Sequence, residues 1–490
     1  MSPLIALVPP LAVIPFILFF GERRRNFREG SIIAAGLLLL AVNSKIYSEV
    51  VAGRVVESGE FPLLGVFGLK LSAEPMGVTF ALLASFLWVV TTVYSIGYMR
   101  GHDEKNQTRF YVCFAIAIAA VMAAAYADNL LTLFVAYEVL SLSTVPLVAH
   151  AGNDASRRAA RVYVGILIGS SIGLFLPAVI WTASAAGSLD FVPGGVLGDA
   201  GLSQGALGVL LALFVFGIGK AAVMPLHRWL PAAMVAPTPV SALLHAVAVV
   251  KTGVFSILKI VTYTFGIDTV SASGAADFLL PFAAFTVIAA SLVAFTKDNL
   301  KARLAYSTIG QLSYIVLAAL LATSMSITGG ALHIVMHAFG KITLFFCAGA
   351  LLVAAHKTLI SELDGIGRRM PITMGAFFIG ALGIIGLPPA GGVWSKLLIA
   401  GGSLDTGTAF WAIVLLISTL LNIAYLLPIP MRAFLRADPG VPPGAPSPWE
   451  EAPFASLWAI VLTALATVLL FLNPGPLIEL LGLIQWRTES

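Results

Sequence analysis

Long apolar runs separated by short polar segments dominate the chain. A helix needs about 20 predominantly apolar residues to cross the hydrocarbon core of a bilayer, and this pattern predicts an all-α integral membrane protein with about 14 transmembrane helices. The predicted spans are 3–20, 31–49, 76–98, 110–127, 129–150, 162–184, 206–224, 239–263, 277–296, 304–323, 329–355, 372–400, 408–432 and 452–474.

Composition agrees with a membrane protein. Of the 490 residues, 59% are hydrophobic and 11% are charged, whereas soluble domains carry about 25% charged residues. The two cysteines, Cys113 and Cys347, lie in separate apolar spans and predict no disulfide framework. We expect no soluble domain, and no nucleic acid as a partner, because the basic residues are confined to short loops.

Lysines and arginines are distributed unevenly between the predicted loops. With the N-terminus outside, 19 of the 28 fall in inner loops, 4 in outer loops and 5 within spans. Cytoplasmic loops of membrane proteins carry an excess of Lys and Arg. The pattern predicts a multi-pass protein of a bacterial inner membrane with both termini outside. Because arginines follow the first apolar run, that run is predicted to be a retained helix and not a signal peptide.

Charged residues deep in the spans are the first candidates for function. They are Glu138, Lys220, Lys251, Lys341 and Lys396. Ionisable groups at such depth are costly and usually face a wet cavity or a partner charge. Burial disfavours the charged form of a lysine, so a buried lysine can alternate between accepting and releasing a proton. One carboxylate among several ammonium groups makes a poor sodium cage, and we therefore expect a proton path in this chain.

Histidines extend this set of candidates. His333, His337 and Lys341 follow one another at i, i+4 and i+8 on the eleventh predicted helix, so they share one face. A proton relay is favoured over a metal site because a third ligand is lacking. His245 precedes Lys251 in the eighth span and is either a relay residue or bonded to a backbone carbonyl. No metal and no cofactor are expected.

Two other polar residues have simpler interpretations. Lys259 lies near the outer end of its span and is expected to extend its ammonium group to the membrane surface. Asp128 marks the short turn between the fourth and fifth spans and is expected to be solvated.

Prolines predict two broken helices. Pro225 should end the seventh helix near Lys220, and the segment 386–392, GLPPAGG, should interrupt the twelfth helix before Lys396. Two broken helices five spans apart, each with a lysine, suggest two inverted five-helix repeats. The expected domains are helices 1–3 at 1–109, a first repeat of helices 4–8 at 110–263, a second repeat of helices 9–13 at 277–432, and a linker with helix 14 at 433–490.

One long stretch resembles a known signature. Residues 216–255 read FGIGKAAVMPLHRWLPAAMVAPTPVSALLHAVAVVKTGVF. They resemble the proton-translocating segment of the antiporter-like subunits of respiratory complex I, membrane-bound hydrogenases and multisubunit Mrp cation/proton antiporters. The segments 298–308, 333–341 and 386–396 match in the same order, so that the resemblance covers roughly 110–400.

The resemblance implies roles in the first repeat. Glu138 and Lys220 match the family's paired switch on helices five and seven, in which a carboxylate controls when a lysine releases its proton. Lys251 or His245 matches the connecting residue on helix eight.

It also implies roles in the second repeat. Lys341 and His337 match the central relay, and Lys396 matches the terminal lysine on helix twelve. The chain departs from the family pattern at Ala232, where an aspartate is usual, and at Tyr137, where a tryptophan is usual. Neither departure removes a titratable member of the path.

The segment 249–254, VVKTGV, looks most like the D subunit of Mrp antiporters. The resemblance thus implies a proton-translocating subunit of a multisubunit monovalent cation (Na⁺)/proton antiporter, with Mrp-type subunits as partners and protons and Na⁺ as the ions. The alternative is a proton-pumping membrane subunit of a complex I-like NADH-quinone oxidoreductase or a membrane-bound hydrogenase. With no CxxC set and no dinucleotide-binding loop, the chain is expected to be a transport subunit and not itself an enzyme.

Overall fold

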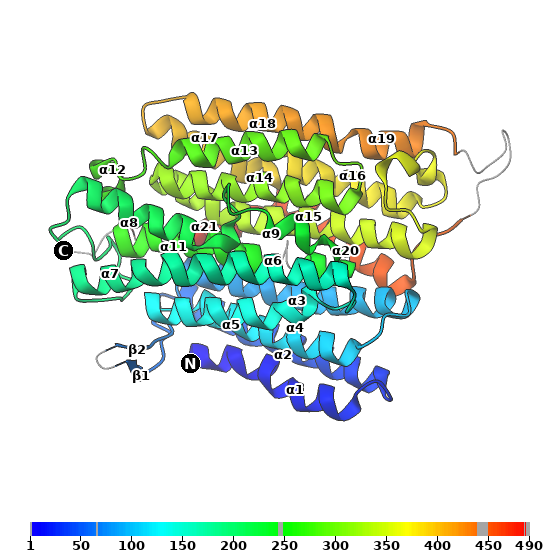
Figure 1. The fold of residues 1–490 in the computed structure, drawn as a ribbon, viewed down its shortest axis with the longest axis horizontal. Coiled ribbons are helices and arrows are strands. Elements are labelled where there is room, and N and C mark those ends of the chain that lie inside the picture. The colour runs from blue at the N-terminus through cyan, green and yellow to red at the C-terminus, as the bar shows by residue number, and fades with distance from the viewer. Residues whose placement is uncertain (1, 65–66, 244–247, 439–448, 485, 487–490) are drawn as a thin grey trace.

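The computed structural model describes residues 2–64, 67–243, 248–438, 449–484 and 486. Long helices run side by side along one direction, and their connections gather at two opposite ends of the bundle (Figure 1). One end holds a small β-hairpin, and the other holds the turn between the first two helices (Figure 1). The predicted all-α membrane fold is confirmed, with the hairpin as an addition that the apolar pattern did not predict.

Three long helices and the hairpin precede the first predicted repeat. The elements are η1 (Pro3–Leu7), α1 (Val8–Phe20), α2 (Arg25–Val51), β1 (Phe61–Leu64), β2 (Phe67–Leu69) and α3 (Pro75–Gly101). The strands β1 and β2 pair antiparallel. Glu74 caps α3, because its carboxylate accepts hydrogen bonds from the backbone N–H groups of Met76 and Gly77 at 2.7 and 2.8 Å.

The middle of the chain contains the first predicted break. Its elements are α4 (Gln107–Ala125), α5 (Leu130–Val148), α6 (Asp154–Ser170), η2 (Ser171–Phe175), α7 (Leu176–Ala186), α8 (Gln204–Gly217), η3 (Gly219–Ala221), α9 (Trp229–Ala232), η4 (Ala233–Val235), α10 (Thr238–Ala242), α11 (Val249–Ile260), η6 (Val261–Phe265) and α12 (Ile267–Ser273). The break is confirmed: α8 ends just before Lys220, which lies in the short 3₁₀ turn η3. His245 lies outside the described residues.

The second half contains the other predicted break. Its elements are α13 (Leu280–Phe295), α14 (Leu300–Leu321), α15 (Ser324–Ala355), η7 (Ile360–Glu362), η8 (Ile366–Arg368), α16 (Pro371–Ile385), α17 (Gly392–Asp405), α18 (Phe410–Leu426), α19 (Pro428–Leu435), α20 (Phe454–Leu472) and α21 (Gly475–Gly482). Between α16 and α17, Gly386 adopts φ +84°, a left-handed conformation that ends the helix.

The chain is a multi-pass membrane protein. Within the described segments, ten helices are long and apolar enough to cross a bilayer, or eleven if the pair 249–265 and 267–273, bent by 82°, counts as one span. Three shorter apolar helices, α8, α13 and α16, lie where the sequence also predicted spans. The number fourteen stays a prediction.

Two helices of opposite direction begin in the same way. The tripeptide Asp-Asn-Leu starts both α5 and α14. The side chain of Asn129 accepts a hydrogen bond from the N–H of Thr132 at 2.8 Å, and Asn299 accepts one from Ala302 at 3.0 Å. Each asparagine also forms an isolated β-bridge to a later loop, at Asp190 and Leu359 respectively. Equivalent starts at opposite ends of the bundle are what an inverted repeat requires.

Candidate functional site

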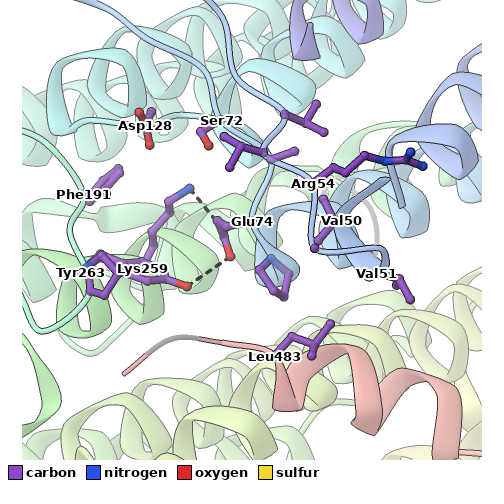
Figure 2. Close-up of a pocket in the computed structure, with 16 residues that line it drawn as sticks. Val50, Val51, Arg54, Ser72, Glu74, Asp128, Phe191, Lys259, Tyr263 and Leu483 are labelled. Carbon is purple, nitrogen blue, oxygen red and sulfur yellow. Dashed lines mark hydrogen bonds and ion pairs between the residues drawn. The ribbon is translucent and has the colours of Figure 1, made fainter. Parts of the chain in front are cut away.

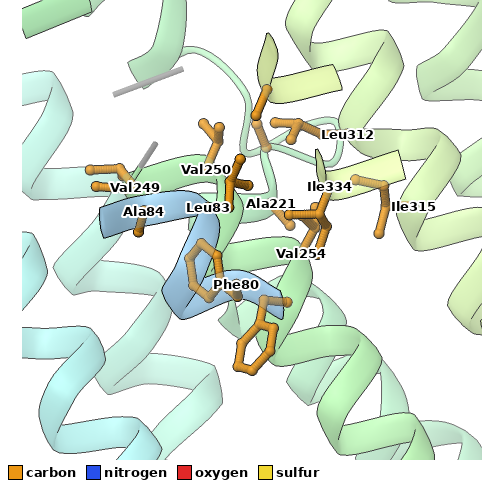
Figure 3. Packing of buried hydrophobic residues seen from close by; sticks show 14 of the residues in the cluster. Phe80, Leu83, Ala84, Ala221, Val249, Val250, Val254, Leu312, Ile315 and Ile334 are labelled. Atoms are coloured by element: carbon orange, nitrogen blue, oxygen red, sulfur yellow. The ribbon is translucent and has the colours of Figure 1, made fainter. Parts of the chain in front are cut away.

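The deep lysines lie inside an apolar core. Side chains from α3, α11, α14 and α15, including Phe80, Val250, Leu312 and Ile334, pack around the turn η3 at Ala221 (Figure 3). The four lysines predicted for the path, Lys220, Lys251, Lys341 and Lys396, are all buried within this protein interior. Each ammonium group must therefore find its partners inside the protein.

Lys220 is held by α5. Its Nζ donates to the carbonyl oxygen of Tyr137 at 2.8 Å and to the hydroxyl of Ser141. The same Nζ lies 3.0 Å from the centroid of the Tyr137 ring, and the Lys220 backbone N–H donates to the Tyr137 hydroxyl at 3.1 Å. Sequence reasoning had noted Tyr137 only as a departure from a family pattern and had missed Ser141. Tyr137 and Ser141 are four residues apart and therefore lie on one face of the helix next to Glu138. This spacing could have indicated them from the sequence.

Glu138 and Lys220 interact electrostatically without a close ion pair. Among the described residues no N–O contact within 4 Å joins the two, but the Glu138 carboxylate lies near enough for its charge to act on the Lys220 ammonium. Glu138 is half-buried, and its Oε1 is buried without a hydrogen-bond partner in the described part of the chain. On the same helix, the neighbouring Val139 and Leu142 are exposed. The paired switch predicted from the sequence therefore stays a prediction.

A line of neighbouring titratable side chains runs from α11 into the second half of the chain. Lys251 Nζ lies 2.6 Å from His337 Nδ1, and the ring centroids of His337 and His333 lie 5.8 Å apart. His333 Nδ1 lies 2.8 Å from the hydroxyl of Ser395, and His333 Nε2 lies 3.1 Å from Gln311 Oε1. Three predicted residues are thus brought together, and two neutral partners are added that the sequence did not single out.

Lys396 follows Ser395 directly and extends this line to the second break. Its Nζ donates to the carbonyl of Ile385, the last residue of α16, at 2.8 Å, and lies 3.4 Å from the hydroxyl of Thr419. A side chain at Gly386 would place its Cβ 2.7 Å from Lys396 Cδ. The break in the helix therefore creates both the acceptor and the space for this lysine.

Lys341 lies on a side branch. Its Nζ donates to the hydroxyl of Ser307 at 2.8 Å, and the hydroxyl oxygens of Ser307 and Tyr425 lie 2.9 Å apart. The Tyr425 hydroxyl donates its proton to Asn422 Oδ1. Lys341 shares a helix with the two histidines, but it binds Ser307 of α14, which in turn contacts Tyr425 of α18. Its predicted central position in the relay stays a prediction.

The expectation for Lys259 is wrong. The side chain does not reach the surface: it is 1% exposed, and its Nζ forms an ion pair with Glu74 Oε1 at 3.3 Å (Figure 2). The sequence could not reveal this partner, because Glu74 lies far away along the chain at the start of α3. Asp128 is partly exposed and pairs with Lys70 at 3.9 Å.

A metal centre finds no support in the geometry. Over the described ranges, no group of three or more His, Cys, Asp or Glu side chains is placed to hold an ion. The histidines are engaged by hydroxyl, amide and amine groups.

Comparison with known proteins places this geometry in a family. The family model described as "NADH:quinone oxidoreductase/Mrp antiporter, TM" matches residues 127–422. The chain belongs to this family. The matched segment contains every residue of the predicted path, from Glu138 to Lys396.

Individual relatives extend the match over nearly the whole chain. NADH-quinone oxidoreductase subunit N of Desulforudis audaxviator (strain MP104C) is 31% identical over 485 residues, which cover 96% of this chain and 95% of that protein. A chain in the Mrp complex from Dietzia sp. DQ12-45-1b shares the fold with a TM-score of 0.85 at 21% identity, over 98% of this chain and 96% of that chain. A chain of the archaeal membrane-bound sulfane sulfur reductase has a TM-score of 0.83 at 21% identity, with the same coverage.

Proposed function

We propose that this chain is the proton-translocating subunit of a multisubunit monovalent cation (Na⁺)/proton antiporter of the Mrp type. The observation that carries the proposal is the line of contacts from Lys251 through His337 and His333 to Ser395, which ends beside Lys396. Every group in this line can accept and donate a proton, and the line is enclosed by apolar side chains. A static structural network would not need two lysines and two histidines in series at membrane depth.

The proton enters this line at Lys220. Its ammonium donates hydrogen bonds to neutral oxygens, those of Tyr137 and Ser141, while the charge of Glu138 acts on it without a close ion pair. Approach of Glu138 would stabilise the protonated lysine, and its withdrawal would favour release. Lys251 lies on α11, which packs directly against the backbone of Lys220 at Gly253. His245 remains the alternative connecting residue of this proposal.

The cation path and the coupling belong to other subunits. One half-buried carboxylate beside several ammonium groups does not supply the oxygen ligands that Na⁺ prefers. The chain therefore acts as a transport subunit and not as an enzyme, with the other subunits of an Mrp-type complex as partners. The proposal places it in a bacterial inner membrane with both termini outside, as the distribution of Lys and Arg predicts.

The two inverted repeats are part of this proposal. Two features support them: the matching Asp-Asn-Leu starts of α5 and α14, and the broken helices that present Lys220 and Lys396. The proposed boundaries are 110–263 and 277–432, flanked by 1–109 and 433–490.

A second candidate is a proton-pumping membrane subunit of a complex I-like NADH-quinone oxidoreductase. The 31% identity to a subunit N over nearly the full length favours it. Purification of the tagged chain from its native membrane, followed by identification of the copurifying subunits, separates the two: small antiporter subunits support the first candidate, and redox subunits support the second.

The mechanism is tested by proton flux in everted vesicles that contain the whole complex. Glu138→Ala and Lys220→Ala should each lower flux by at least about a hundredfold, since proton transfer by a positioned group contributes at least that much. Lys220→Arg should fail as well, because arginine stays charged and cannot cycle a proton. Lys105→Ala and Glu479→Ala, both exposed, are matched controls with unchanged flux. Wild-type flux in Lys220→Arg would refute the switch.

A further inference from the structure

A cavity of about 400 Å³ lies at the hairpin end of the bundle, away from the line of contacts described above. Arg54, Ser72, Glu74, Asp128, Lys259 and Tyr263 are among the residues that line it (Figure 2). Its rim is open to solvent, because Arg54 and Val55 are largely exposed. Lys259, by contrast, is 1% exposed and reaches into the cavity from α11.

Glu74 is a fixed partner for Lys259. Its carboxylate is bound to the backbone N–H groups of Met76 and Gly77 at the start of α3, and the hydroxyl of Tyr263 donates to Oε2 at 3.3 Å. Lys259 Nζ adds an ion pair at 3.3 Å from Oε1. The acceptor is thus anchored by a helix start, and the lysine ammonium lies 5.1 Å from the ring centroid of Phe191 and 5.6 Å from that of Phe255.

A stripe of polar residues on α11 leads from the position after Lys251 to this pair. Thr252, Ser256 and Lys259 follow one another at i, i+4 and i+7 and so share one face of the helix. The Ser256 hydroxyl donates to the Thr252 carbonyl at 2.7 Å. The Thr252 hydroxyl is buried and has no hydrogen-bond partner within the ranges that the structure describes.

The stripe begins beside Lys251 and ends at the cavity. Lys251, which contacts His337, directly precedes Thr252. Eight residues of α-helix separate Lys251 from Lys259, a rise of about 12 Å. Directly after Lys259 the helix changes to the π-helical turn η6, a geometry that recurs at functional sites.

We propose that Lys259 is a second proton outlet, through which the first half of the chain releases protons to the hairpin end of the bundle. This inference rests on the proposed function. An N–H bond of the Lys259 ammonium breaks, and its proton passes to the Glu74 carboxylate, whose Oε1 lies 3.3 Å away, and from there to solvent in the cavity. The neutral amine then accepts a proton that arrives along the hydroxyls of Thr252 and Ser256, and the ion pair with Glu74 forms again.

The surroundings of the cavity suit such a step. Burial raises the pKa of the Asp128 carboxyl above its ordinary value, although Lys259 and Lys70 both act against this shift. Asp128 is therefore a second group at the cavity that can take up a proton. The outlet differs from a route through Lys396, which lies in the second half of the chain and is hydrogen-bonded to Ile385 and Thr419.

The test separates a proton carrier from a static ion pair. In everted vesicles with the whole complex, Lys259→Met and Lys259→Arg should both lower proton flux by about twofold, because proton transfer at one of the two outlets stops while the route through Lys396 stays open. Arginine keeps the ion pair with Glu74 but cannot release its proton, so a merely structural lysine would be rescued by it. Lys45→Met, an exposed lysine on α2, is the matched control and should keep wild-type flux.

Access to the cavity gives an independent readout. Asp128 lines the cavity and is partly exposed, so Asp128→Cys should react with a membrane-impermeant cationic thiol reagent added at the hairpin side, whereas both native cysteines are buried. Wild-type flux in Lys259→Arg, or no reaction of Asp128→Cys, would overturn the outlet. If Lys259→Met prevents assembly, the proton flux of Lys259→Arg still tests the outlet. Loss of flux in Glu138→Ala and Lys220→Ala with normal flux in both Lys259 variants would reject the outlet and leave the proposed function in place.

Discussion

Three of the deep lysines bind neutral oxygens. Lys220 binds a carbonyl and a serine hydroxyl, Lys341 a serine hydroxyl, and Lys396 a carbonyl with a threonine hydroxyl nearby. A carboxylate partner would strongly favour the charged form of each lysine. Neutral oxygens also solvate the ammonium, but they favour the charged form less. Lys259 is the exception, with a carboxylate partner at the edge of the core.

Ser141 provides a test of this solvation. Ser141→Ala removes one of the hydrogen bonds of the Lys220 ammonium, at a cost of about 1–3 kcal/mol for a buried charged donor. The protonated state is then less populated, and we expect proton flux to fall several-fold while assembly is unchanged. Ser143→Ala is a matched control on the same helix, because Ser143 bonds only the carbonyl of Leu140. Equal flux in the two variants would show that Ser141 does not support Lys220.

The sequence predicted the charged members of the site and not their partners. A lysine or histidine in an apolar run stands out in the sequence, because burying it costs free energy whichever helices pack against it. Serine, threonine and tyrosine are common in membrane helices, and only the packing of distant helices selects Ser395 or Gln311 as partners of His333. The position of Lys259 was misjudged for the same reason, since its burial depends on where the start of α3 lies.

The broken elements place their lysines through close backbone approach. A Cβ at Gly253 would lie 2.5 Å from Ala221 N and 2.8 Å from Lys220 Cβ, so α11 packs against η3 with no room for a side chain. Both breaks were readable from prolines and glycines, because these residues end helices for local reasons. The contact between η3 and α11 could not be predicted from the sequence, because several turns separate the two segments along the chain.

Gly253→Ala tests whether this contact matters. The added methyl group must displace η3 or α11, at a cost of about 1–3 kcal/mol, and the displacement moves Lys220 away from its oxygens. We expect a lower melting temperature of the purified complex and a loss of proton flux. In Gly165→Ala on α6 a Cβ meets nothing within 4 Å, and this variant should be neutral or slightly more stable. Equal melting temperatures and flux for the two variants would contradict the packing argument.

At the scale of the whole molecule, the ends of the bundle differ in charge. At one end, Arg23, Arg24, Arg25 and Arg100 gather around a surface pocket. At the other, Glu74, Asp128 and Asp190 accompany Lys70 and Lys259. The apolar pattern predicted this layout from sequence alone, because the positions of spans fix the side on which each loop emerges. It could not distinguish helices that cross the membrane fully from shorter helices such as α8 and α13.

The charge difference predicts which end faces the cytoplasm, and cysteine labelling in intact cells measures it. Asp154, whose side chain is 95% exposed, should lie inside, and the exposed Asp199 should lie outside. A membrane-impermeant thiol reagent should therefore label Asp199→Cys directly, and Asp154→Cys only after the cells are permeabilised. The native cysteines give little background because both are buried. The reverse pattern would invert the direction of the proton path and place the cavity at Lys259 on the cytoplasmic side, where it would serve as an inlet.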